Sequence, residues 1–161
     1  MNGKIFAINI SSEKKTPKKQ ISSGNLIKDT GLKGDAYNKI PNRQISITTI
    51  ELLKEQALCP RVSKNSDFTV KTGDYCETLT ISGIDLSQVE TGDTFLIGEK
   101  ARICISGKSM DCWVFCPWNK LEGECPLPKH FLFARVIESG EIKVQNEIKQ
   151  LEGTQLSLSA Y

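Results

Sequence analysis

The sequence predicts a mostly β domain whose strands form a closed or nearly closed barrel, with one or a few short helices. From residue 67 onward, short apolar runs alternate with glycine and aspartate turn signals, a pattern typical of many closely spaced strands. The chain has 161 residues, 39% of them hydrophobic and 25% charged, which fits one globular domain. No internal repeat or linker divides it, so we expect residues 1–161 to form a single domain.

The expected elements follow in chain order. Residues 49–57 predict the helix, because Thr49 can serve as its N-cap, Leu52 and Leu53 supply an apolar face, and Pro60 prevents continuation. Residues 11–23 are polar and lysine-rich and contain Pro17, so they predict a flexible loop. The expected strands lie at residues 4–10, 43–47, 68–70, 79–81, 95–97, 102–106, 131–138 and 142–144.

Charge and composition exclude some classes of partner. With 21 basic and 19 acidic residues the net charge is +2, so nothing indicates nucleic-acid binding. The one basic cluster, Lys14-Lys15 and Lys18-Lys19, is interrupted by Pro17 and is interpreted as a solvated loop. The N-terminus lacks a signal-peptide pattern and no apolar run is long enough for a membrane span, so we expect a cytoplasmic protein without a membrane partner.

Cysteine usage points to one long loop. The six cysteines of a cytosolic chain stay reduced, which favours metal binding or thiol chemistry over disulfides. Between the strands expected at 102–106 and 131–138, the chain places three cysteines, the only histidine and both tryptophans. A loop this long that concentrates reactive side chains is typical of a functional site on a rigid scaffold. Its residues of interest are Cys112, Trp113, Cys116, Trp118, Cys125 and His130.

Two chemistries remain open for this loop. Cys112, Cys116, Cys125 and His130 form a C-x3-C-x8-C-x4-H set, which has the ligand types of a structural zinc site but not a common finger spacing. A thiolate is also the side chain that attacks as a nucleophile or binds a soft metal. The remaining cysteines, Cys59, Cys76 and Cys104, are expected to pack as small apolar residues.

The order and spacing of several short motifs resemble the MOSC domain, the module related to the C-terminal domain of molybdenum cofactor sulfurases. The resemblance spans roughly residues 3–150, and three positions depart from the family pattern, with Tyr37 and Trp113 in place of histidine and Thr78 in place of asparagine. The matching motifs are Gly31-Leu32-Lys33-Gly34-Asp35-Ala36, Arg43-Gln44-Ile45-Ser46, Gly73-Asp74-Tyr75-Cys76-Glu77-Thr78-Leu79-Thr80, Gly83-Ile84-Asp85-Leu86, Gly92-Asp93, Ile97-Gly98, Gly107-Lys108, Cys112, Cys116, Gly123-Glu124-Cys125 and Phe133-Ala134-Arg135-Val136.

The resemblance implies a MOSC-type β-barrel and a loop cysteine that binds molybdenum of the cofactor or carries sulfur as a persulfide. By position, Cys116 is the first choice for the metal-binding and reactive cysteine and Cys112 the second. The chain has no room for a desulfurase domain, so the sulfur donor would be a separate protein such as a cysteine desulfurase. A zinc-binding module without catalysis, and a molybdenum-dependent reductase component for N-hydroxylated compounds, are the alternatives.

The charged residues of these motifs are the expected cofactor-binding groups. Lys108, Arg43 or Arg135 would line a concave site around Cys116, with Lys108 and Arg135 supplying positive charge near the thiol. Arg43 and Arg135 would hold the cofactor's phosphate, because a guanidinium grips a phosphate through two hydrogen bonds. Asp35 and Glu77 either contact the ligand or form an ion-pair network with Arg43 that holds the loops at the barrel mouth. Both interpretations of these residues remain open at the level of sequence.

Overall fold

The computed structural model describes residues 1–14, 16–56, 70–108 and 131–152. Within them strands predominate, with one α-helix and one 3-10 turn, so the predicted fold class is confirmed. The strands are β1 (Asn2–Ile10), β2 (Lys19–Ile21), β3 (Ser23–Ile27), β4 (Gly31–Leu32), β5 (Ile45–Thr49), β6 (Leu79–Ser82), β7 (Thr94–Ile97), β8 (Ala101–Lys108), β9 (Leu132–Glu138), β10 (Gly140–Lys143) and β11 (Glu147–Leu151). The helical elements are α1 (Ile50–Gln56) and η1 (Leu86–Gln88).

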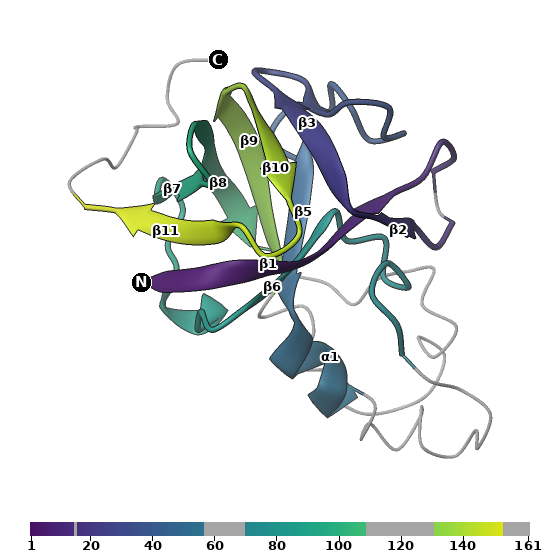
Figure 1. Ribbon diagram of the computed structural model, residues 1–161, viewed down its shortest axis with the longest axis horizontal. Coiled ribbons are helices and arrows are strands. Elements are labelled where there is room, and N and C mark those ends of the chain that lie inside the picture. Colours follow the sequence, from purple (N-terminus) through teal and green to yellow (C-terminus); the bar gives the residue numbers. More distant parts are fainter. Residues whose placement is uncertain (15, 57–69, 109–130, 153–161) are drawn as a thin grey trace.

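Seven strands close into a barrel (Figure 1). Their order is β11-β7-β8-β9-β5-β6-β1, and β1 pairs with β11 to complete the ring. All neighbours are antiparallel except β5 and β6, which run parallel and are connected through α1 and the segment that follows it. Strand β2 pairs with the end of β1, and a small sheet of β10, β3 and β4 lies beside the barrel. Closure leaves the ring strands without open edges.

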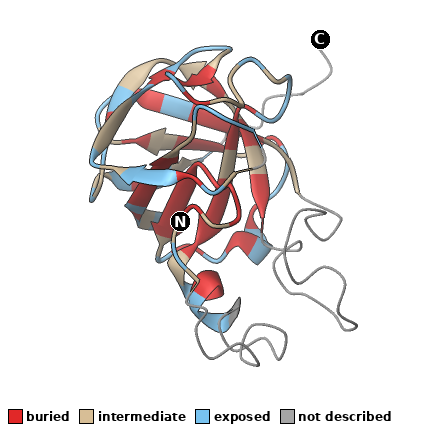
Figure 2. Ribbon diagram, turned by 90° about the vertical axis from the view of Figure 1, so that its right-hand side faces the viewer, coloured by how far each residue is buried: buried red, intermediate tan, exposed pale blue. Residues whose placement is uncertain are grey.

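Alternation along the strands fills the barrel with branched apolar side chains. On β5 and β6, Ile45, Ile47, Leu79 and Ile81 are almost fully buried within the main core. Figure 2 shows buried residues along the barrel strands and exposed residues mostly at the periphery of the molecule. A second, smaller apolar cluster lies outside the ring, where Leu52 and Leu53 of α1 pack with residues that include Tyr75 and Phe131.

The helix begins where the sequence predicts it. Thr49 Oγ1 accepts a hydrogen bond of 3.1 Å from the backbone N–H of Leu52, so Thr49 caps the first turn as expected. Helix α1 covers Ile50–Gln56, and residue 57 lies outside the described residues. No helix in the described parts of the chain is long and apolar enough to cross a membrane.

The strand predictions are confirmed for most of the described chain, and two local predictions are wrong. Residues 11–23 are not a single flexible loop, because β2 and the start of β3 lie in them and β2 pairs with β1. The strand expected at residue 43 begins only at Ile45, after a turn in which Asn42 has a φ of 60°. Of the strand expected at 68–70 only Val70 is described, and it is not in a strand. The expectation missed β4 and β11, both of which pair through backbone hydrogen bonds.

Candidate functional site

Polar side chains occupy the outer face of the barrel where β9, β5, β6 and β1 lie side by side. Ser46 pairs with Phe133 across β5 and β9, and the Thr78 N–H donates to the Ser46 carbonyl. The Asn9 N–H in turn donates to the Thr78 carbonyl. These four residues, which we call the outer row, cross four neighbouring segments in register. Since strand side chains alternate between faces, they point away from the apolar interior.

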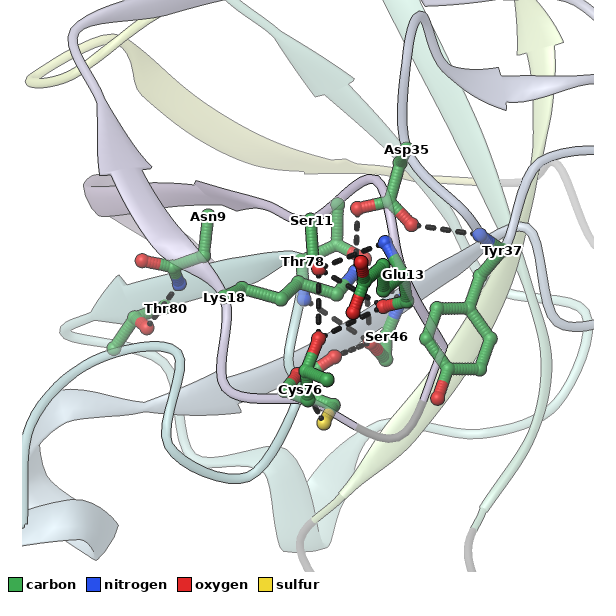
Figure 3. A network of polar contacts seen from close by, with 11 residues as sticks. Asn9, Ser11, Glu13, Lys18, Asp35, Tyr37, Ser46, Cys76, Thr78 and Thr80 are labelled. Atoms are coloured by element: carbon green, nitrogen blue, oxygen red, sulfur yellow. Dashed lines mark hydrogen bonds and ion pairs between the residues drawn. The ribbon is translucent and has the colours of Figure 1, made fainter.

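A buried lysine covers the outer row. Lys18 Nζ lies 2.7 Å from Asp35 Oδ2 and donates to Thr78 Oγ1 at 3.0 Å, and the side chains of both charged residues have no more than 1% exposure (Figure 3). The ammonium also lies 5.1 Å from the centre of the Tyr37 ring. Burial lowers the pKa of Lys18, against the opposing attraction of Asp35. The prediction that this lysine belongs to a solvated loop is therefore wrong, because the Asp35 carboxylate and the Thr78 hydroxyl replace water around it.

Asp35 owes its position to the glycine-rich turn that was singled out in the sequence. Gly34 adopts a φ of 87°, a conformation that glycine reaches without strain, and Asp35 follows it directly. The second carboxylate oxygen, Oδ1, accepts a 2.9 Å hydrogen bond from the Tyr37 N–H. Both Asp35 oxygens thus have partners, and its ionic partner is Lys18 rather than the expected Arg43.

Glu77 is the most enclosed charged residue of the site. It is fully buried, and its Oε1 accepts hydrogen bonds from the Gly73 N–H and from Thr80 Oγ1. Burial raises the pKa of Glu77 to about 7, although these hydrogen bonds favour the charged form. Gly73 has a φ of 90°, and a Cβ there would lie 2.2 Å from the Lys18 carbonyl oxygen, so only glycine lets this turn approach Lys18.

Two described cysteines are packing residues, as expected. The Cys76 thiol donates to the Thr16 carbonyl at 3.0 Å, and burial raises its pKa to about 11. Cys76 does not lie in a strand, however, because its φ of 61° places it in the turn before β6. Cys104 is buried on β8, where burial also raises the pKa of its thiol. Neither thiol is poised to ionise near neutral pH.

The three predicted cationic residues do not form one group. The Arg43 guanidinium lies 4.9 Å from the centre of the Phe133 ring, at one end of the outer row. Arg135 is on the same face of β9, two residues from Phe133, and pairs with Cys104 across β8 and β9. Lys108 instead donates to the Ser87 carbonyl at 3.4 Å, next to η1. The structure thus places the Arg43 guanidinium over Phe133 of β9, the strand that carries Arg135, and places Asp35 and Glu77 around Lys18. Lys108 makes other contacts.

The predicted reactive loop lies outside the described residues. This applies to Cys112, Trp113, Cys116, Trp118, Cys125 and His130, and also to Cys59. The described strands end close to the outer row, because Lys108 pairs with Leu132 and Gly107 pairs with Phe133. Among the residues that the structure describes, no group of three histidine, cysteine, aspartate or glutamate side chains could hold a metal ion.

Sequence reasoning missed the residue at the centre of this site. Lys18 is one of four neighbouring lysines, and nothing in its local pattern distinguishes it from Lys19, which is exposed. One signal was available: Asp35 lies in a glycine-rich turn, and a buried carboxylate needs a cationic partner. The sequence did not identify Lys18 as that cation. Ser46 and Thr78 were quoted as motif residues, but their roles as hydroxyl partners appear only once β5 and β6 are aligned.

The fold is shared with several solved bacterial proteins. YuaD from Bacillus subtilis superposes with a TM-score of 0.73 at 18% identity, covering 92% of this chain and 94% of YuaD. YiiM from Escherichia coli gives a TM-score of 0.69 at 20% identity over 94% of this chain and 70% of YiiM, and YiiM from Geobacillus stearothermophilus gives 0.66 at 16% identity over 93% and 75%. No protein-family model matches the sequence, and no curated protein matches it significantly. The chain has the fold of YuaD and YiiM.

Proposed function

We propose that this chain is a MOSC-type protein that handles molybdenum cofactor, or sulfur bound for a metal–sulfur centre, through a loop cysteine. Cys116 would bind the metal or carry the persulfide, and Cys112 would assist it. The cofactor's anionic part would lie at the partly exposed end of the outer row, where Arg43 contacts Phe133 beside Ser46. A separate protein, such as a cysteine desulfurase, would supply the sulfur.

One observation carries this proposal: motifs far apart in the sequence meet at the outer row. Asp35 comes from the 31–36 motif, Ser46 from 43–46, Thr78 from 73–80 and Phe133 from 133–136. These are segments on which the resemblance to the MOSC domain rests. Residues that serve only the core would point into the barrel, whereas these lie on its outer face. The shared fold with YuaD and YiiM supports the same assignment.

The donors around the outer row suit an anionic cofactor. Arg43 is exposed and its guanidinium stacks on Phe133, so its N–H groups remain available for a phosphate. The Ser46 hydroxyl is half-buried beside it, and a Cβ on Gly107 would meet no atom within 4 Å, which indicates open space next to Phe133. Lys18 is enclosed, so its role is to orient Thr78 and to hold the turn that carries Asp35. When bound, the cofactor would supply a molybdenum centre that accepts a thiolate ligand.

The buried thiols favour a loop cysteine as the reactive group. Cys76 lies nearest the outer row, but its pKa of about 11 and its hydrogen bond to Thr16 leave it protonated near pH 7. Cys104 is enclosed on β8. A persulfide donor needs an accessible thiolate. In this proposal that thiolate therefore belongs to Cys116, with Cys112 assisting, rather than to the buried Cys76 or Cys104.

The test measures molybdenum, sulfane sulfur and zinc per chain after expression in a host that makes the cofactor. We expect wild-type protein to carry molybdenum or sulfane sulfur, Cys116→Ser to lose at least about tenfold of it, and Cys112→Ser to lose less. Cys104→Ser is the matched control and should keep the load, with folding checked by circular dichroism. About one zinc per chain that Cys116→Ser and His130→Ala both remove would contradict the proposal and favour the structural zinc site.

A further inference from the structure

A second feature of the site concerns a proton rather than a ligand. In the described part of the chain, the polar layer outside the barrel buries three charged side chains: Lys18, Asp35 and Glu77. Lys18 and Asp35 neutralise one another at 2.7 Å. Glu77 is fully buried and none of the described hydrogen bonds joins it to a cation. If Glu77 is ionised, this layer holds one unbalanced negative charge, and burying such a charge is costly.

The contacts of Glu77 indicate which protonation state of its carboxyl group the surroundings favour. Oε1 has two donors, the Gly73 N–H and the Thr80 hydroxyl, whereas Oε2 is buried and has no hydrogen-bond partner among the described residues. An ionised carboxylate needs hydrogen-bond donors for both oxygens, whereas a neutral carboxyl leaves far less charge without solvent. The enclosure of Oε2 therefore favours the protonated form.

Glu77 also holds the turn that contacts the backbone of Lys18. Gly73, which donates to Glu77, accepts hydrogen bonds through its carbonyl from the N–H groups of Lys18 and Cys76. One carboxyl group thus ties the 71–78 segment to the segment that delivers Lys18. A change in the charge of Glu77 acts directly on this junction.

We propose that Glu77 is a proton-linked latch: the neutral carboxyl keeps the 71–78 segment docked against the segment that carries Lys18, and loss of its proton loosens that junction. The titratable groups that interact electrostatically with it are Lys18, from the segment before β2, and Cys76, from its own segment; Asp35 and Asp74 act on these neighbours in turn. Its hydrogen-bond partner on β6 is the neutral Thr80, which also accepts from the neutral Asn9 of β1.

The direction of the pH dependence follows from the raised pKa. In the closed segment the pKa of Glu77 is about 7, and in the opened segment the solvated carboxyl returns to its ordinary value near 4.5. The closed state is therefore favoured below the ordinary pKa and loses that advantage as pH rises toward 7. The equilibrium constant for opening should increase about tenfold per pH unit in this window, by about two orders of magnitude in all, and then level off.

The test is amide hydrogen exchange by NMR between pH 5 and 8.5 on protein without cofactor, with each rate divided by its intrinsic rate. The opening constant at the Gly73 and Cys76 amides should rise and level off above about pH 7 in wild-type protein, while Glu77→Gln should keep it low and flat. The Gly98 amide, which donates to Glu147 in a remote turn, is the internal control. A flat wild-type profile, or the same rise in Glu77→Gln, would overturn the proposal.

A direct titration guards against a variant that folds poorly. The 13C resonance of the Glu77 carboxyl in wild-type protein should show a midpoint near 7, and a midpoint near 4.5 would overturn the latch. Both measurements use cofactor-free protein. Their failure would therefore leave the proposed function standing, and failure to load molybdenum or sulfur would leave the latch standing.

Discussion

The inner and outer faces of the same strands are both buried here, but they are stabilised in different ways. On β5, Ile47 points into the barrel while its neighbours Ser46 and Thr48 point outward beneath other segments. On β6, Leu79 points inward and Thr80 points outward. The inner face is held by burial of apolar surface, which is non-directional and independent of pH. The outer face is held by one ion pair and a set of hydrogen bonds, in which each missing partner carries a cost.

This difference explains where function can reside. The interior is filled by apolar side chains, whereas the outer layer concentrates Lys18, Asp35 and Glu77 at the convergence of the motifs. A buried ion pair often contributes no more to stability than apolar residues of similar volume would. The presence of these charges therefore fits a layer that orients residues toward a ligand, in agreement with the proposed function.

The largest effect is expected from breaking the buried ion pair. Lys18→Met leaves the Asp35 carboxylate buried without its cation and should lower the free energy of unfolding by about 3–5 kcal/mol. The double variant Lys18→Met/Asp35→Asn removes both charges and should lose clearly less. Urea denaturation measures each variant, and Lys19→Met, at an exposed neighbouring lysine, should stay within about 0.5 kcal/mol of wild type. Equal losses in the single and double variants would show that the pair is not coupled.

The interior should respond to lost volume. Leu79→Ala removes a fully buried side chain from the main core and should cost about 2–5 kcal/mol through lost burial and the cavity left behind. This cost should stay constant from pH 5 to pH 8, since the described residues that form the main core are apolar. Phe6→Ala, at a residue that is 40% exposed where a bulge interrupts β1, is the control and should cost far less. A Leu79→Ala cost that varies with pH would contradict the separation of the two faces.

The smallest effects should distinguish a buried hydroxyl that has hydrogen-bond partners from one that has none among the described residues. Thr80 Oγ1 donates to Glu77 and accepts from Asn9, so Thr80→Val should cost about 1–3 kcal/mol. Thr48 Oγ1 is buried without a hydrogen-bond partner among the described residues, so Thr48→Val should be neutral or stabilising by up to about 1 kcal/mol. The two threonines are partners in register on β5 and β6, which makes them a matched pair for thermal unfolding. A destabilised Thr48→Val would indicate a partner for that hydroxyl.

The barrel could be predicted because its evidence is local. Alternating apolar residues and glycine turns mark β6 to β9, and Thr49 with Leu52 and Leu53 marks the helix. Two-residue β4 and the edge strand β2 carry too few side chains to show a period, and they form because β3 and β1 offer them backbone partners. Short strands of this kind depend on tertiary pairing, which a window of sequence does not contain.

The site was predicted in its parts but not in its arrangement. Asp35, Glu77 and Arg43 were identified from their motifs, yet their partners proved to be Lys18, Gly73 with Thr80, and Phe133 respectively. These contacts join residues up to 90 positions apart, from Arg43 to Phe133, so they depend on barrel register. Lys108 was expected near Cys116 because it precedes the cysteine loop; in the structure its register partner is Leu132 and its side chain reaches Ser87.

The central claim, that the outer row holds the anionic part of a molybdenum cofactor, is tested most directly by pterin content. Protein from a cofactor-producing host is oxidised, and the fluorescent pterin is counted per chain in wild type, Arg43→Ala and the control Arg102→Ala, whose guanidinium pairs with Glu138 at an exposed site on β8. Arg43→Ala removes a cation–π contact with Phe133 worth about 0.5–1 kcal/mol, and no other side-chain contact of Arg43 with a described residue, so the chain should remain folded. The account predicts at least a tenfold loss of pterin in Arg43→Ala and none in Arg102→Ala. Wild-type pterin content in Arg43→Ala, or no pterin in the wild-type protein itself, would contradict it.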